Sequence, residues 1–137
     1  MRLLLLSLAL ISPVSANPLE KFQWEKRLIL SYISGDSKAF QKQFLEHKEA
    51  LAERDLIIIN LAKSELDLEG VVKLSNEEKR ELRSRYQLSH PADSVFILIG
   101  KDGGEKSRQL QTWNPEKFFA LIDTMPMRKA EMKKQQK

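Results

Sequence analysis

The chain has 137 residues, a formal net charge of +4 and no cysteine. Without cysteine it can form no disulfide, carry out no thiol redox chemistry and offer no thiolate to a metal. Its two histidines, His47 and His90, do not support a histidine-rich metal cluster either. We therefore expect no metal and no cofactor. The length suits one domain that buries roughly two-thirds of its unfolded surface.

Residues 1–16 have the features of a secretory signal peptide. Arg2 and the free amine are positive, residues 3–11 form an apolar run, and Val14-Ser15-Ala16 places short side chains before a cleavage point. The run is shorter than the roughly 20 apolar residues that span a membrane, so we expect cleavage after Ala16 rather than an anchor. This predicts a periplasmic or secreted protein with no transmembrane segment after cleavage.

Basic residues concentrate at the other end of the chain. Residues 128–137 contain five basic side chains and one acid, Glu131, which accounts for the whole excess of positive charge. Termini of this kind are commonly frayed and solvated, so we interpret residues 128–137 as a basic tail beyond a single domain of residues 17–127. The alternative is that the tail binds an anionic surface.

The first part of the domain alternates strand-like and helix-like patterns. Residues 27–33 form a continuous apolar run typical of a buried strand, and residues 34–37 have turn and cap chemistry. A helix is predicted from there to about residue 53. We interpret His47 as a helix-face residue with a hydrogen-bond partner rather than as a catalyst. The apolar face of this helix consists of Phe40, Phe44, His47 and Leu51.

A second buried strand is predicted over residues 55–61, because its three isoleucines favour a strand over a helix. Residues 62–74 are ambiguous, since Gly70 interrupts their apolar pattern. Ser75 and Glu78 have the spacing of a capping box, which predicts a short helix that begins there.

The last third predicts a hairpin and a closing helix. Residues 94–99 form a third apolar strand, and the more polar residues 105–111 suit a fourth strand at an edge of the sheet. Asn114-Pro115 is an N-cap with proline at the first helical position, and this helix is expected to stop near Met125-Pro126. The whole order predicts an α/β, thioredoxin-like fold with a central mixed four-stranded sheet (β-α-β-α-β-β-α) flanked by helices.

The segment from Gly100 to Ser107 resembles a phosphate-binding loop, G-x-x-x-x-G-K-[ST], with Glu105 in place of the second glycine. A phosphate loop needs backbone N–H groups that an anion can approach and a helix that starts at the loop. The side chain and charge of Glu105 oppose the first requirement, and the strand-like pattern that follows opposes the second. We therefore interpret the segment as a hairpin with Asp102-Gly103 as a type I′ turn.

Few other residues suggest chemistry. Asp36 and Ser37 lie at a predicted helix start, where anions can bind, and are a candidate anion site, although both also have a structural role as cap residues. Trp24 and Trp113 are interpreted as packing anchors rather than as platforms for nucleic-acid bases, and we expect no nucleic-acid partner. Because no nucleophile motif is present, no catalytic residue is assigned.

Residues 123–128, Asp-Thr-Met-Pro-Met-Arg, are unusual for a helix end, which normally favours glycine or asparagine. Met125 and Met127 around Pro126 make an adaptable apolar knob, and the cation Arg128 follows it. Such a knob can cap the core or form an exposed contact surface, and the sequence leaves both interpretations open.

Several segments carry a family resemblance: residues 99–104 (Ile-Gly-Lys-Asp-Gly-Gly), residues 122–128 (Ile-Asp-Thr-Met-Pro-Met-Arg), Trp24 with Arg27, and residues 53–56 (Glu-Arg-Asp-Leu). Together they resemble a bacterial family named domain of unknown function 4174, over nearly the whole domain. That family is similar to the thioredoxin-like domain of some animal extracellular matrix and sushi-repeat proteins. The resemblance implies an exported, thioredoxin-like protein and no established activity.

The resemblance also points to a departure from working thioredoxins. Their reactive Cys-x-x-Cys follows the first strand, where this chain has residues 35–40, Gly-Asp-Ser-Lys-Ala-Phe. Disulfide exchange requires a thiolate that attacks sulfur, and no residue of this segment provides one.

We therefore predict an exported, redox-inactive thioredoxin-like module with a binding or structural role, whose partner is another exported protein or an envelope component. The alternative is an enzyme of unrecognised type that uses polar residues around the position of the thioredoxin cysteines, namely Asp36, Ser37, Arg54 or Asp102. The candidate contact residues of the binding module are Arg54, Lys101, Asp102, Met125, Met127 and Arg128.

Overall fold

The computed structural model describes residues 17–88 and 93–136. The predicted signal peptide, residues 1–16, and His90 lie outside the described residues. In chain order the elements are η1 (Glu20–Phe22), β1 (Arg27–Tyr32), α1 (Lys38–Glu46), α2 (Lys48–Glu53), β2 (Leu56–Asn60), β3 (Val71–Val72), α3 (Asn76–Arg85), β4 (Val95–Ile99), β5 (Glu105–Leu110), α4 (Pro115–Asp123) and α5 (Pro126–Gln135).

The strands form one mixed sheet in the order β3-β2-β1-β4-β5. β1 pairs in parallel with β2 and antiparallel with β4, which continues into the edge strand β5 as a hairpin. The predicted edge position of the last strand is confirmed. The sheet has five strands instead of the expected four, because two residues of the ambiguous segment, Val71 and Val72, pair with β2.

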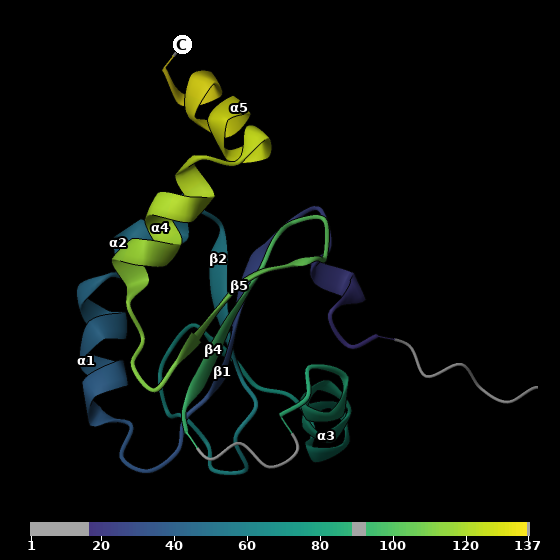
Figure 1. Cartoon of the computed structure of the whole chain (residues 1–137). Helices are drawn as coiled ribbons and strands as arrows, with labels where there is room; N and C mark the ends of the chain where they lie inside the picture. The colour runs from purple at the N-terminus through teal and green to yellow at the C-terminus, as the bar shows by residue number, and fades with distance from the viewer. Residues whose placement is uncertain (1–16, 89–92, 137) are drawn as a thin grey trace, which may run out of the picture.

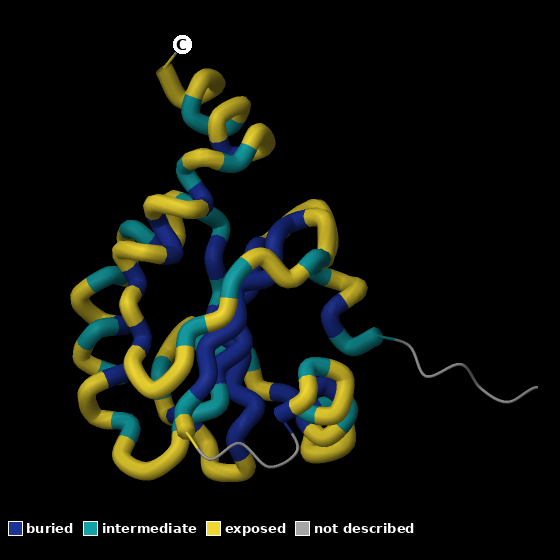
Figure 2. The backbone as a smooth tube through the Cα atoms, in the orientation of Figure 1, coloured by how far each residue is buried: buried dark blue, intermediate teal, exposed yellow. Residues whose placement is uncertain are grey.

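Apolar side chains alternate between the two faces of the sheet and build one core on each. Helices lie over both faces (Figure 1). Ile29 of β1 joins the core under α1, α2 and α4, whereas its neighbours Leu28 and Leu30 join the core under α3 and η1. Both cores are buried along β1 and β4, which are dark blue in Figure 2. The result is a sheet between two helical layers, which confirms the predicted thioredoxin-like α/β class.

Local capping explains where two helices begin. The Ser75 side chain accepts a hydrogen bond from the Glu78 backbone N–H while the Glu78 carboxylate accepts one from the Ser75 N–H, so the predicted capping box is confirmed at α3. The Asn114 side chain accepts from the Lys117 N–H at the start of α4, with Pro115 next to it.

The single helix predicted up to residue 53 is instead two helices that break at His47. His47 has φ −112° and ψ 14°, outside helical geometry. Its ring Nδ1 lies 2.8 Å from the carbonyl oxygen of Gln43, so the predicted hydrogen-bond partner is confirmed. The apolar spacing continued across the break and therefore concealed it.

The hairpin between β4 and β5 is confirmed, but the predicted two-residue turn at Asp102-Gly103 is wrong. The strands are joined by residues 100–104, and the Gly103 N–H donates to the Gly100 carbonyl at 3.0 Å. This hydrogen bond centres the turn on Lys101 and Asp102. Among the loop residues 100–104, only Gly103 takes a positive φ, of 87°. Asp102 therefore lacks the left-handed conformation that a type I′ turn requires. Ser107 lies within β5 rather than in a helix, as the hairpin interpretation requires.

The two tryptophans differ in their surroundings. Trp113 is buried, with ring centroids 4.9 Å from Phe40 and 6.3 Å from Phe96, so the prediction of a packing anchor is confirmed. The same prediction is wrong for Trp24, which is 62% exposed. Trp24 has φ 70°, and its backbone N–H donates to the Lys101 carbonyl, so it joins the lead-in segment to the hairpin through its backbone.

The segment predicted as a frayed basic tail is instead helical from Pro126 to Gln135. The resulting helix, α5, projects beyond the end of the sheet near the β4–β5 hairpin (Figure 1). Met125-Pro126 ends α4 as predicted, but proline is also favoured at the first position of a helix, and Pro126 begins α5. Among the described residues, no helix combines the length and the apolar character needed to cross a membrane.

Candidate functional site

Four of the predicted contact residues meet around one small cavity at the hairpin end of the sheet. Its volume is about 150 Å³. The hairpin contributes one wall and the start of α5 contributes the other, as the lining residues Arg27, Gly100, Lys101, Asp102, Lys106, Met125, Pro126 and Met127 show. The glycine-rich loop and the Met-Pro-Met segment, which lie far apart in sequence, are therefore neighbours in space.

Arg27 is the most deeply buried residue that lines this cavity. It is the first residue of β1, and only 1% of it is exposed. Its Nη1 and Nη2 donate to the two carboxylate oxygens of Glu131, each at 3.1 Å, and Nη1 also donates to the Arg54 carbonyl at 2.9 Å. A buried guanidinium is costly unless it is paired and hydrogen-bonded, and Glu131 on α5 supplies that pairing.

Lys101 is the second cation of the site, and its side chain is buried although the residue lies in the hairpin turn. The turn directs its side chain back towards the sheet, where it is buried. Its Nζ donates to Glu131 at 2.6 Å and to Asp55 at 2.9 Å. Asp102 remains exposed at the tip, and its carboxylate accepts bonds from the Gly104 N–H and from Lys106.

Arg54 and Arg128, two more predicted contact residues, form the adjoining half of the network. Arg54 donates to both carboxylate oxygens of Asp123, at 3.1 and 2.8 Å, and its guanidinium lies 4.6 Å from the ring centroid of Phe119. Arg128 is buried and donates to Asp123 at 3.1 Å and to the Glu53 carboxylate at 3.0 Å. These contacts join the ends of α2 and α4 to the start of α5.

Three acids of the network, Asp55, Asp123 and Glu131, are held in their ionised forms. Burial acts to raise the pKa of Glu131, but hydrogen bonds and charges from Arg27 and Lys101 outweigh it, so the pKa lies below its ordinary value. The pKa values of Asp55 and Asp123 are lowered in the same way, against burial, mainly by Lys101 for Asp55 and by Arg54 for Asp123.

The cations respond in the matching direction. Burial acts to lower the pKa of Lys101, and its bonds to Glu131 and Asp55 raise it above the ordinary value. A general acid or base works best when its pKa lies near the working pH. These shifts move each group away from neutral pH, so the arrangement suits fixed charge recognition better than proton transfer.

The structure separates the residues of the predicted enzyme alternative. Asp36 and Ser37 follow the carboxyl end of β1, whereas Arg54 and Asp102 lie near its amino end. The six residues of β1 span roughly 20 Å, so these four side chains do not converge on one site. Asp36 accepts the Lys38 N–H at 2.9 Å and Ser37 Oγ accepts from Gln41, so both have local structural partners.

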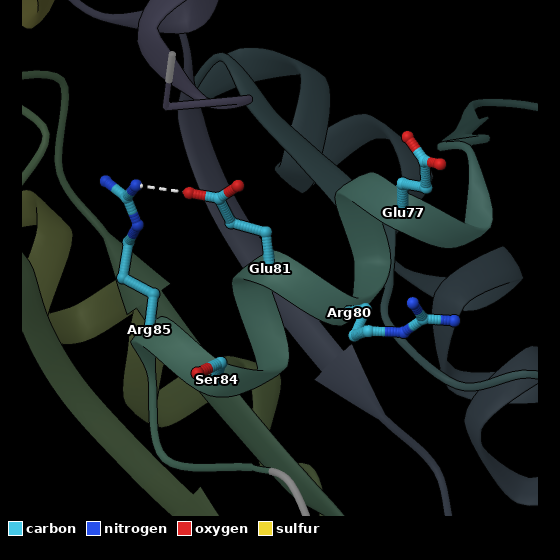
Figure 3. A pocket seen from close by; sticks show the side chains of 5 residues that line it. All are labelled: Glu77, Arg80, Glu81, Ser84 and Arg85. Carbon is cyan, nitrogen blue, oxygen red and sulfur yellow. Dashed lines mark hydrogen bonds and ion pairs between the residues drawn. The ribbon is translucent and has the colours of Figure 1, made fainter. Parts of the chain in front are cut away.

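A second hollow lies on the outer face of α3 and is a weaker candidate for a binding site (Figure 3). Glu81 and Arg85 form an ion pair at 2.7 Å and extend to the same side of the helix as Glu77, while Arg80 extends away from them. All the lining residues come from one helix, so no second element encloses a ligand there.

Sequence reasoning missed the residues that organise the site: Arg27, Asp55 and Glu131. Two of them had a weak signal in the sequence. Arg27 is a charged residue at the start of a buried strand, and Glu131 is the single acid among the basic residues 128–137. Their partners are distant along the chain, so no local pattern could reveal the pairing.

Comparison with known proteins places the chain in a family. The model of the family described as Domain of unknown function (DUF4174) matches residues 18–131. The chain belongs to this family. The match ends at Glu131, so it includes the first part of α5 together with the rest of the site.

One curated relative is similar in sequence. "Coiled-coil domain-containing protein 80" of Danio rerio is 29% identical over an alignment of 140 residues. The alignment covers 88% of this DUF4174 chain. The chain spans only 16% of the length of that relative.

Solved structures share the fold at low sequence identity. Thioredoxin peroxidase I of Plasmodium yoelii has a TM-score of 0.56 at 14% identity and covers 77% of this chain and 75% of its own. BsSco, from the Sco family of cytochrome c oxidase assembly proteins, has a TM-score of 0.53 at 13% identity, covering 77% and 83% respectively. Identities this low show a shared thioredoxin-like fold and do not transfer an activity.

Proposed function

We propose that this DUF4174 domain is an exported, redox-inactive binding module, and that its contact surface is the hairpin end of the sheet, around the cavity between Lys101 and Met127. The observation that carries the proposal is the convergence of four predicted contact residues on that cavity. The partner is another exported protein or an envelope component.

The chemistry of the two ends of the sheet supports a role in binding rather than in catalysis. At the end where thioredoxins carry their cysteines, this chain has Asp36 and Ser37, so thiol exchange has no attacking sulfur. At the other end, the acids and cations with shifted pKa values are stabilised in their charged forms. Fixed charges beside an exposed methionine, Met127, make a surface that can recognise a partner by charge and by adaptable apolar contact.

Export is part of the proposal and rests on the pattern of residues 1–16. Cleavage after Ala16 is expected to give a protein that begins at Asn17. Amino-terminal sequencing of the protein from an envelope or culture-medium fraction tests this. A protein that is recovered only from the cytoplasm and still begins at Met1 would contradict it.

The contact surface can be tested by site-specific photo-crosslinking in cells that express the protein. A photoreactive residue at position 127 is expected to give a discrete adduct that excess unlabelled protein competes away. Leu45, which is also exposed but lies on α1, is the matched control position and is expected to give no such adduct. The surface would be misassigned if position 45 gave the competed adduct and position 127 gave none.

A further inference from the structure

The geometry points to a carboxylate-binding site within the hairpin-end surface, which we call the carboxylate cradle and define as Arg27 and Lys101. We propose that Glu131 occupies the cradle in this structure, and that an acidic side chain of the partner displaces it. This inference rests on the proposed function, because it names the chemistry of the group that the surface receives.

The cradle has the geometry with which proteins bind ligand carboxylates. Arg27 meets the Glu131 carboxylate with two parallel N–H···O bonds of 3.1 Å, and Lys101 adds a bond of 2.6 Å. Forked arginine contacts of this kind combine charge with a defined direction. A carboxylate from another molecule could make the same three bonds.

Both cations are positioned by groups other than Glu131. Arg27 donates to the Arg54 carbonyl at 2.9 Å, and Lys101 donates to Asp55 at 2.9 Å. These contacts remain when Glu131 leaves. The cradle is therefore preorganised, which lowers the cost of binding a second carboxylate.

Glu131 is held by its charged contacts rather than by apolar packing. Arg128 is the only buried residue of α5 among those that the structure describes, and the helix appears mainly exposed and intermediate beyond it (Figure 2). Arg128 is anchored to Glu53 and Asp123, so the turn that carries Glu131 can open without loss of that anchor. Exposed helix ends with few apolar contacts open at low cost.

The cavity beside the cradle has room for the ligand. Arg27 and Lys101 line it together with Met125 and Met127, and its volume of about 150 Å³ equals that of roughly five water molecules. A carboxylate on a short aliphatic stem fits these dimensions, since the stem can lie against the methionines. The side chain of glutamate or aspartate has this form.

Chemical rescue tests the cradle. Glu131→Ala removes the internal carboxylate, and added sodium acetate is expected to raise the thermal midpoint of this variant by roughly 3–6 °C above sodium chloride of equal ionic strength when acetate reaches ten times its Kd. Glu53→Ala is the matched control, because Glu53 also pairs with a buried arginine but lies outside the cavity. It is expected to respond equally to acetate and chloride.

Two results would overturn the cradle: a Glu131→Ala variant that responds to acetate no more than to chloride, or an equal acetate response in Glu53→Ala. If Glu131→Ala does not fold, Glu131→Gln keeps the shape of the side chain and takes its place. Line broadening of carbon-13-labelled acetate by that variant is then expected, and its absence would contradict the proposal. Loss of rescue in the double variant with Arg27→Met assigns the effect to the cradle.

Displacement is tested in the unaltered protein with acetyl-Ala-Glu-Ala-amide and its Gln analogue. The Glu peptide is expected to speed amide hydrogen exchange in residues 131–135 while the sheet remains protected, and the Gln peptide is not. Equal exchange with both peptides would overturn displacement by an acidic side chain. Failure of these tests would remove the carboxylate assignment alone, since the crosslinks from position 127 test the contact surface separately.

Discussion

Arg27 carries a positive charge at the first residue of β1, where almost no solvent reaches it. Its charge is matched by Glu131, which also neutralises Lys101. Removal of one member of a buried pair leaves the other charge uncompensated. The resulting loss of stability is far larger than the net contribution of the intact pair. At the scale of single residues, Glu131 is therefore the group on which the hairpin end depends.

Glu131→Gln is expected to lower the free energy of unfolding by roughly 2–3 kcal/mol, because the buried Arg27 then lacks a compensating charge and Lys101 keeps only Asp55. Glu53→Gln is the control: Glu53 is half exposed and its partner Arg128 keeps Asp123, so a loss below about 1 kcal/mol is expected. Urea denaturation measures both values. Equal losses would mean that burial does not distinguish the two acids.

Residue-level predictions succeeded where the signal was local. The capping residues Ser75 and Asn114 were read correctly because the cap and its partner lie three residues apart. The burial of Lys101 could not be predicted, because its partner Glu131 is 30 residues away along the chain. Trp24 was misassigned because its backbone rather than its ring makes the long-range contact.

At the scale of elements, α5 is the main difference between the prediction and the structure, because a solvated tail was expected there. It is a helix of low apolar content that is attached to the sheet end through Arg128 and Glu131. Such a helix would be marginal by itself, since isolated short helices are unstable in water. Its order in the structure therefore depends on the charged contacts that it makes with the rest of the domain.

Deletion of residues 126–137 is expected to lower the free energy of unfolding by roughly 3–5 kcal/mol, because two buried arginine pairs lose a member. Deletion of residues 136–137 alone removes no described contact to the sheet and should change stability by less than about 0.5 kcal/mol. Thermal or urea denaturation of both shortened proteins provides the measurement. An unchanged stability after the longer deletion would restore the interpretation of a solvated tail.

The elements that could be predicted were those whose sequence pattern is compatible with a single type of structure. The strands β1, β2 and β4 were recognised by their apolar runs, and β2 and β4 are also rich in β-branched residues. Met125-Pro126 has two meanings, since proline both ends one helix and begins another. Val71-Val72 is too short to signal a strand, and its pairing with β2 depends on the fold around it.

At the scale of the whole molecule, sequence order was sufficient for the fold and insufficient for the function. Parallel pairing of β1 and β2 across α1 and α2 followed from the alternation of elements. The candidate site lies at the opposite end of β1 from Asp36 and Ser37, so the positions of thioredoxin cysteines gave no guidance to it. A site built from charge pairs between distant segments becomes visible only after folding.

The pKa shifts predict how stability depends on pH. The lowered pKa values of Asp55, Asp123 and Glu131 contribute stability above their unfolded values, near pH 4, which is lost as pH falls through the lower folded values. The raised pKa of Lys101 has the opposite sense, and its contribution is complete well below pH 10. Stability should therefore be level between pH 6 and 8 and decline below about pH 4, with a smaller decline in Glu131→Gln. Urea denaturation across this range provides the check.

The central claim is that Glu131 locks α5 into the Arg27–Lys101 pair. Carbon-13 NMR titration of the Glu131 side-chain carboxyl tests it most directly, with the resonance assigned by its absence in Glu131→Gln. The account predicts a midpoint clearly below the ordinary glutamate value of about 4.3, because two cations stabilise the ionised form. A midpoint at that value would mean that Glu131 is free in solution, and a midpoint above it would mean that burial outweighs the two cations. Either result would contradict both the locked helix and the occupied cradle.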